Sequence, residues 1–128
     1  NSGPQPINYG SDACDFCKMN IVEEQFAVQC LNKKGKSYHF DDSYCMISFL
    51  KNGMLRSEDL GTVYFSDFNK SGRWLIADSA YLLHSDSIHT PMRGNTASFN
   101  TEQERTEAMT KYSGNKLLWK DINPFAKK

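Results

Sequence analysis

The sequence predicts an α+β protein with two degenerate β-β-α-β repeats that share or adjoin one core. Two stretches, 40–53 and 99–114, lead to this prediction, because each passes from the end of an apolar strand through a capping residue and a helix to a glycine. Each is followed by a strand that ends in a similar pair, Asp67-Phe68 or Asp121-Ile122. In a chain of 128 residues, each unit alone is too small to be stable. We therefore expect two small antiparallel sheets, each with one helix.

The first repeat is expected to begin with a strand and a turn. Phe26, Val28 and Cys30 alternate along this strand, which places them on one face and predicts that Cys30 is a small core residue. Gly35 then supplies the positive φ of a hairpin turn. The elements expected after it are a strand over 37–40, a helix that is capped by Asp41 or Asp42 and ends at Gly53, and a strand over 62–68.

The second repeat is expected to follow the same order. Its elements are extended segments over 74–77 and 80–84, a loop over 85–95, a strand over 96–100, a helix from Thr101 to Tyr112 and a closing strand over 116–122. Thr101 and Glu104 have the spacing of a capping box, in which a hydroxyl and a carboxylate each accept a hydrogen bond from an unpaired backbone amide. Gly114 is the expected end of this helix.

The chain is therefore divided into three segments. Residues 1–10 are polar and rich in Pro and Gly, and we expect a flexible N-terminal tether. Residues 11–70 form the first β-β-α-β unit with a Cys-rich loop, and residues 71–128 form the second unit with a Thr-Pro-Met loop. The start of the chain is typical of a processed protein, and such a leader often follows the lipid-carrying cysteine of a bacterial lipoprotein.

Composition argues against several classes of function. Fifteen acidic residues balance fifteen basic ones, so the basic surplus of a nucleic-acid-binding protein is absent. We find no run of 18 apolar residues, and thus expect no transmembrane helix. The sequence shows neither a nucleophile with its base nor a phosphate-binding glycine loop, so we do not expect an enzyme.

The motif Cys14-Asp15-Phe16-Cys17-Lys18-Met19 gives the chain its chemistry. Thioether sulfur is soft and uncharged, so a Met two residues after a Cys favours Cu(I) over zinc. Met92 lies in a loop, Thr90-Pro91-Met92-Arg93-Gly94, where no helical or strand period accounts for an apolar residue. A thiolate helped by one or two thioethers would hold Cu(I) and still release it by ligand exchange.

The cysteines at positions 14, 17, 30 and 45 leave other interpretations open. Four cysteines can form two disulfides in three ways. A structural zinc site could gather Cys14, Cys17 and Cys45 with His39. Cys45 is expected in the first helical turn, where unpaired amides favour a thiolate.

A thiol-disulfide oxidoreductase is a third alternative, because Cys14-x-x-Cys17 and Thr90-Pro91 resemble a redox dithiol beside a proline loop. A redox C-x-x-C motif should open a helix after a buried strand. Here Gly10-Ser11-Asp12-Ala13 precedes the motif and strand-like residues follow it, which argues against this alternative.

Taken together, these motifs resemble the NosL family of copper-binding accessory proteins for nitrous oxide reductase. The resembling segments are Cys14-Asp15-Phe16-Cys17-Lys18-Met19-Asn20-Ile21, Phe26-Ala27, Phe40-Asp41-Asp42-Ser43-Tyr44-Cys45-Met46, 74–81, 90–95 and Ala97-Ser98-Phe99. They occur in family order over nearly the whole chain. Arg93 departs from the pattern, because a small residue is common at this position, and no cysteine for lipid attachment is present.

The resemblance implies a copper chaperone with Cu(I) ligands at Cys17, Met19 and Met92. Secondary candidates are Cys14, Cys45, His89, His39 and Asp42, and a second metal such as zinc is possible. It further implies a lipoprotein anchored in the membrane by an N-terminal lipid, in the periplasm or on the outer face of the cell envelope. The partners implied are nitrous oxide reductase and its assembly ABC transporter complex.

Overall fold

The computed structural model describes residues 3–126, which form two antiparallel sheets. The first sheet has the order β2-β1-β3-β4 and comprises β1 (Val28–Asn32), β2 (Ser37–Phe40), β3 (Leu60–Ser66) and β4 (Trp74–Ile76). The second has the order β6-β5-β7 and comprises β5 (Tyr81–His84), β6 (Thr96–Phe99) and β7 (Asn115–Leu117). The helices are α1 (Ser43–Lys51), α2 (Glu102–Ala108) and α3 (Trp119–Ile122), with 3-10 turns η1 (Glu24–Phe26), η2 (Ser57–Asp59) and η3 (Ala77–Ser79). The predicted α+β class is confirmed.

The two repeats have the same topology. The first runs β1-β2-α1-β3 and the second β5-β6-α2-β7, and in both the first strand lies between the second and the third. Strand β4 differs from the expected division at residue 70, because it pairs with β3 and extends the first sheet. The hydrogen-bonded border between the sheets therefore falls between β4 and β5.

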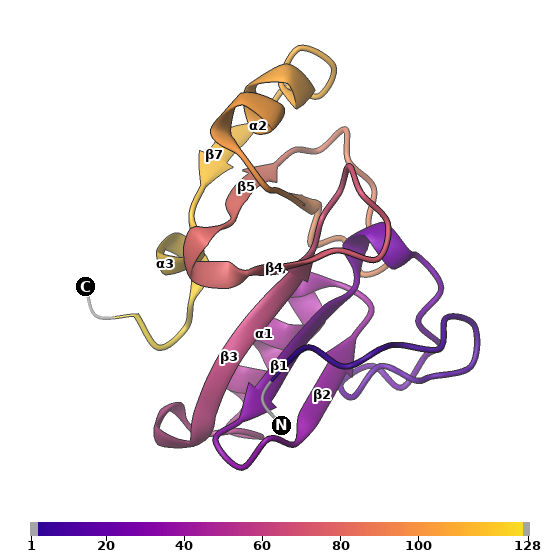
Figure 1. The fold of residues 1–128 in the computed structure, drawn as a ribbon, viewed down its shortest axis with the longest axis vertical. Helices are drawn as coiled ribbons and strands as arrows, with labels where there is room; N and C mark the ends of the chain where they lie inside the picture. The colour runs from indigo at the N-terminus through magenta and orange to yellow at the C-terminus, as the bar shows by residue number, and fades with distance from the viewer. Residues whose placement is uncertain (1–2, 127–128) are drawn as a thin grey trace.

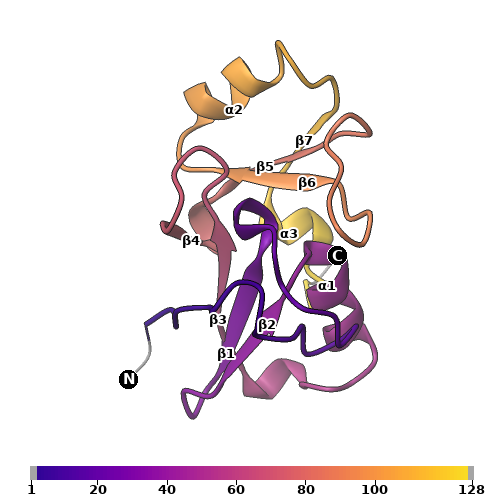
Figure 2. The same ribbon diagram turned by 90° about the vertical axis from the view of Figure 1, so that its right-hand side faces the viewer.

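The sheets cross each other in space. Figure 1 shows α1 behind the first sheet and the N-terminal segment in front of it, with the second sheet and α2 above. Figure 2 shows the strands of the second sheet running across those of the first, with α2 on the far side of the second sheet. None of the helices among the described residues has the length and apolar character of a membrane span.

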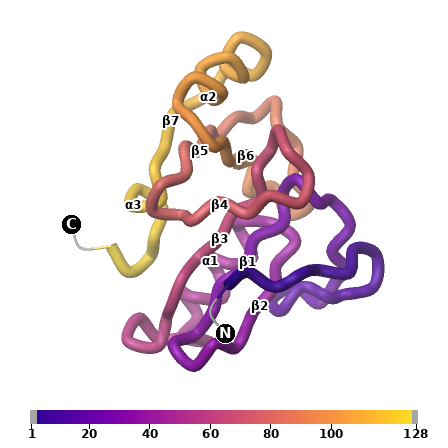
Figure 3. The backbone as a smooth tube through the Cα atoms, viewed as in Figure 1, coloured from indigo at the N-terminus to yellow at the C-terminus, as the bar shows by residue number. Residues whose placement is uncertain are grey.

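The N-terminal segment packs against the first sheet, although a flexible tether was expected over residues 1–10. The Gln5 amide donates to Gln29 Oε1 at 2.8 Å, and Gln29 Nε2 donates back to the Gln5 carbonyl at 2.8 Å. This pair satisfies the side chain of Gln29, which is buried in the middle of β1. Figure 3 shows the trace of this segment crossing β1. The first two residues of the expected tether lie outside the described part of the chain.

One large core joins the two repeats, as the sequence predicts. Phe40, Met46 and Phe65 of the first repeat pack in the same cluster as Leu82 of β5 and Trp119 of α3. The rings of Phe65 and Trp119 meet edge to face, with centroids 5.8 Å apart. A smaller cluster beneath α2 contains Phe26, Leu83, Ile88, Ala97 and Phe99.

Phe26 was predicted on one face with Val28 and Cys30, and this is wrong. It lies in η1 before the strand and packs in the smaller cluster, whereas Val28 and Cys30 lie in the large one. The period-two pattern misplaced it because β1 is buried on both faces and alternation carries no signal there. The core position of Cys30, which has no exposed surface, is confirmed.

The ends of the helices test the capping residues that the sequence predicts. Asp42 caps α1 by accepting from the Tyr44 amide, and Gly53 follows the helix with φ +77°, as predicted. Thr101 caps α2 by accepting from the Glu104 amide at 3.1 Å, so the hydroxyl half of the predicted capping box is confirmed. Two further predictions for the second repeat are wrong. Helix α2 ends at Ala108 rather than at Tyr112, and residues 119–122 form α3 rather than a strand.

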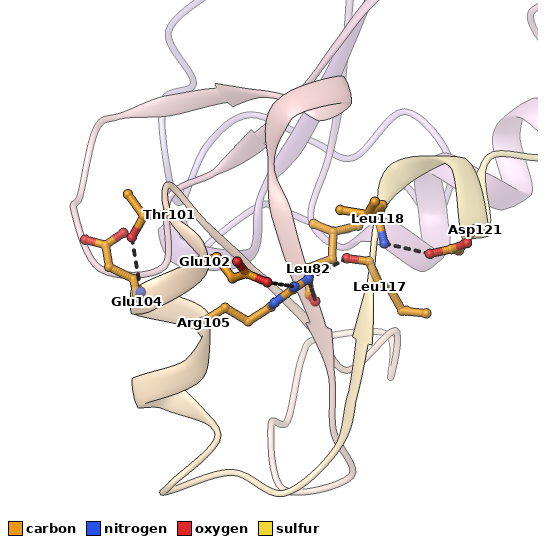
Figure 4. A network of polar contacts seen from close by, with 8 residues as sticks. All are labelled: Leu82, Thr101, Glu102, Glu104, Arg105, Leu117, Leu118 and Asp121. Carbon is orange, nitrogen blue, oxygen red and sulfur yellow. Dashed lines mark hydrogen bonds and ion pairs between the residues drawn. The ribbon is translucent and has the colours of Figure 1, made fainter.

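Arg105 fastens α2 to the second sheet, as Figure 4 shows. Its Nη1 donates to the carbonyls of Leu82 in β5, at 3.2 Å, and Leu117 in β7, at 3.0 Å. Its guanidinium also lies 5.2 Å from the centre of the Tyr81 ring, and its residue is only 5% exposed. One planar cation therefore joins one helix and two strands.

We expect Arg105→Ala to lower the free energy of unfolding by about 2–3 kcal/mol, because buried carbonyls lose a charged donor. Denaturant unfolding would measure this loss. Arg105→Lys should recover only part of it, since an ammonium lacks the planar fork. An Ala variant as stable as the unmodified protein would show that Arg105 does not hold α2.

Candidate metal centre

The Cys-x-x-Cys motif lies in a tight loop that precedes the first sheet. An antiparallel bridge between Ala13 and Asn20 closes this loop, and the Cys14 amide donates to the Met19 carbonyl at 2.8 Å. Lys18 has φ +70°, a left-handed conformation that turns the chain back. The motif thus sits in a turn. A redox dithiol is expected at the start of a helix, and this motif does not open one.

Backbone contacts hold this loop against β2. The Asp15 amide donates to the His39 carbonyl at 2.8 Å, and the His39 amide donates to Asp15 Oδ2 at 2.7 Å. Asp41 follows two residues after His39, so fixing the loop here sets its cysteines opposite that carboxylate.

Three cysteines and one carboxylate converge at this point. The ligand atoms of Cys14, Cys17, Asp41 and Cys45 all lie within 4.8 Å of one another, and we call these residues the cysteine cluster. The Cys17 thiol lies 3.7 Å from Asp41 Oδ2, and the Cys45 thiol lies 3.5 Å from Asp41 Oδ1. All four cysteines of the chain are free thiols, so neither disulfide of the alternative prediction is formed.

The cluster has a buried side and an open side. Cys14 and Cys45 have no exposed surface and Asp41 is buried, whereas Cys17 is half-buried. Met19, two residues beyond Cys17, is 63% exposed. Any ion in the cluster would therefore be reached from the side of Cys17.

Asp42, next to Asp41, serves a different purpose from its neighbour. Its Oδ2 accepts from Thr90 Oγ1 at 2.5 Å, from the Met92 amide at 2.8 Å and from the Gly94 amide at 3.2 Å. With the cap bond to Tyr44, this buried carboxylate accepts four hydrogen bonds. Asp42 thus ties the Thr-Pro-Met loop to the start of α1, and it does not belong to the group of ligand atoms in the cysteine cluster.

Gly94 is required by this close approach. A Cβ built there would overlap Asp42 Oδ1 and lie 2.8 Å from Ser43 Oγ and 3.0 Å from the Tyr44 amide nitrogen. Met92 itself is half-buried and packs against the large core.

The two candidate histidines lie outside the cysteine cluster. His39 Nε2 is 2.6 Å from Ser37 Oγ, and burial lowers the pKa of the imidazole. His89 is exposed and belongs to the rim of a separate hollow with Ile88 and Tyr112. His39 therefore does not converge with the three cysteines as the zinc alternative supposed, and Asp41 is the fourth residue of the cluster.

The sequence matches the profile of the NosL family over residues 6–126. The chain belongs to the NosL family. Its fold resembles the crystal structure of the copper chaperone NosL from Shewanella denitrificans, with a TM-score of 0.82 and 20% identity over 97% of this chain and 98% of that one. At that identity the likeness shows the shared fold alone. A comparison with curated proteins gives no match.

The ionisation of the cluster in this NosL-family chain suits a cation. A hydrogen bond from the Cys45 thiol lowers the pKa of Cys14 to about 5 and, with burial, raises the pKa of Cys45. Burial and then the nearby Cys14 charge raise the pKa of Asp41 to about 6. These shifts favour a thiolate at Cys14 and a carboxylate at Asp41 at neutral pH, with Cys45 remaining a thiol. Burial raises the pKa of Cys17, which stays a thiol until an ion displaces its proton.

We expect metal binding in the cysteine cluster to weaken more and more steeply as the pH falls from about 7 to about 5, because protons compete for Asp41 and then for Cys14 in addition to the proton that Cys17 loses on binding. The metal affinity would be measured by chelator competition across this range, with correction for protonation of the chelator. A pH dependence that does not steepen below about pH 6 would contradict a site that includes these two residues.

We expect Asp42→Asn to lower the free energy of unfolding by about 2–3 kcal/mol, because an amide replaces an oxygen that accepts hydrogen bonds. Amide hydrogen exchange at Met92 and Gly94 should also accelerate. Asp86→Asn, at an exposed position of the same loop, is the matched control and should change neither quantity. Unchanged exchange in Asp42→Asn would show that the loop does not depend on this carboxylate.

Proposed function

We propose that this chain is an exported Cu(I) metallochaperone that delivers copper for assembly of the copper centres of nitrous oxide reductase. The observation that carries the proposal is the cysteine cluster, whose four ligand atoms lie within 4.8 Å of one another. Membership of the NosL family and the fold shared with a copper chaperone from Shewanella denitrificans support it.

We infer that the transferable ion is bound on the open side of the cluster by Cys17, Met19 and Met92. Cys17 supplies the charge, and the two neutral thioethers favour Cu(I) over zinc. The exposure of Met19 supports exchange, because an acceptor thiol or thioether can approach without unfolding the loop. The hold of Asp42 on the Met92 amide supports a fixed position for the third sulfur. No step in this proposal needs a catalytic group.

The location and partners follow from the same proposal. The chain would be tethered by an N-terminal lipid in the periplasm or on the outer face of the envelope, and would work with the reductase and its assembly ABC transporter complex. Such a carrier needs a site that is open on one side, and the half-buried Cys17 provides it.

A zinc site is a second candidate with an observation of its own. Three thiols and one carboxylate that converge at Cys14, Cys17, Asp41 and Cys45 can surround a tetrahedral ion. Two of these cysteines are fully buried, as in a structural site. Zinc held there would make folding depend on the metal, whereas a copper carrier must remain folded when it is empty.

We expect the double variant Cys17→Ser with Met19→Leu to bind Cu(I) about 100-fold more weakly, which corresponds to about 2.7 kcal/mol. The affinity would be measured anaerobically against a competing Cu(I) chelator. Met54→Leu is the matched control, because Met54 is 61% exposed but follows the far end of α1. Met92→Leu should also weaken binding.

Wild-type affinity in the double variant would contradict the ligand assignment. Purified protein that carries zinc and unfolds when a chelator removes it would favour the structural zinc site. Metal-free protein that remains folded and takes up one Cu(I) would favour the chaperone.

A further inference from the structure

Another hollow lies between α1 and the second sheet, and none of the cysteine cluster lines it. It has a volume of about 290 Å³, and we call it the basic groove. Its residues are Ser43, Tyr44, Ile47, Ser48, Lys51, His84, Arg93, Gly94, Thr96, Leu117 and Ile122. Figure 2 shows α1 beneath the second sheet and close to α3, the three elements that form its sides.

One wall of the groove is a stripe along the outer face of α1. Tyr44, Ile47, Ser48 and Lys51 have the spacing i, i+3, i+4, i+7, so they lie in line on the helix. The opposite face of α1 is buried in the large core. Tyr44 is 51% exposed and Ile47 is half-buried, which leaves an apolar strip in contact with solvent. A helix of this kind is free to contact a partner along one side.

The groove carries positive charge without an acidic counterpart. Its charged residues are Lys51 and Arg93, with His84 beside them in the lining, and none of its lining residues is acidic. Within residues 3–126, none of the ion pairs in the structure involves these three side chains. By contrast, the hollow that contains Glu23 and Glu24 has its one arginine paired with an aspartate. Asp121 lines a neighbouring hollow together with Lys51, but its Oδ2 accepts from the Leu118 amide and it is not in an ion pair with Lys51. The charge of the basic groove is therefore available to an acidic ligand.

The groove borders the Thr-Pro-Met loop. Gly94 lines it and donates its amide to Asp42, and Arg93 directly follows Met92. On the helix side, Tyr44 directly precedes Cys45 of the cysteine cluster. A partner seated in the groove would thus lie beside the loop that presents Met92. This placement gives a function to Arg93, which otherwise departs from the family pattern.

We propose that the basic groove docks an acidic segment of the protein that receives the copper, a proposal that rests on the function proposed above. Lys51 and Arg93 attract carboxylates of that segment, and the hydroxyl of Ser48 can donate to them, whereas Thr96 Oγ1 already donates to the Gly94 carbonyl. The apolar residues Ile47, Leu117 and Ile122 cover its apolar side chains. The concave shape and apolar floor suit a protein segment better than the flat surface of an anionic membrane.

The test uses full-length Cu(I)-loaded protein and two probes, apo nitrous oxide reductase and the assembly ABC transporter complex in detergent. Binding of each would be measured by biolayer interferometry at low and high salt. We expect Lys51→Glu and Arg93→Glu each to weaken binding to the probe that the unmodified protein binds, by about tenfold or more. High salt should weaken binding of the unmodified protein to the same probe. Lys33→Glu is the matched control, because Lys33 is exposed in the turn between β1 and β2, and it should bind normally.

Two further measurements separate the possible failures. Lys51→Glu should keep its Cu(I) affinity and its thermal unfolding midpoint, so a loss of docking in this variant cannot be a loss of copper. Normal binding by Lys51→Glu overturns the proposal, as does an unmodified protein that binds Cu(I) but neither probe. If Lys51→Glu abolishes binding to phosphatidylglycerol vesicles but leaves binding to the protein probes intact, the groove binds a membrane. That result also overturns the proposal. Failure to bind Cu(I) at all would instead refute the proposed function.

Discussion

The buried carboxylate of Asp42 is the constraint on which the rest of the candidate site depends. It accepts hydrogen bonds from Tyr44 at the start of α1 and from Thr90, Met92 and Gly94 in the second repeat. Removing such a charge from water is costly, and four donors at one side chain offset that cost. The loop of the second repeat is thereby fixed to the helix of the first, so the two halves meet where the sulfur ligands are expected.

The neighbouring residues Asp41 and Asp42 have different roles, because Asp42 fixes the loop to the helix and Asp41 belongs to the cysteine cluster. Asp42 is saturated by donors, whereas Asp41 faces Cys14, Cys17 and Cys45, and thiols donate only weakly. Asp41 and the Cys14 thiolate then carry negative charge in a mostly buried place. A bound cation would relieve this repulsion, so the same contacts that are unfavourable in the empty protein favour metal uptake.

Local signals allowed much of the fold to be predicted, because caps, turns and strands are encoded by neighbouring residues. Asp42, Gly53 and the hairpin at Gly35 follow rules of this kind. Residues 119–122 do not follow their local pattern, because they form a helix in which Trp119 packs on Phe65. The motif identified Cys14 and Cys17 as neighbours, but the approach of Asp41 depends on how the loop packs on β2, which no local pattern encodes. Gly94 leaves room for Asp42 to reach the second repeat, but the sequence alone does not indicate which residue approaches this glycine.

The duplicated topology supplies an internal comparison for these carboxylates. Phe40 and Phe99 end equivalent strands and both are fully buried, and in each repeat a helix begins three residues later. In the second repeat a neutral hydroxyl, Thr101, is enough to start that helix. At the position of Asp41 the second repeat has the neutral Asn100, so a carboxylate there is not needed to start a helix, and Asp41 instead faces cysteines that only the first repeat contains.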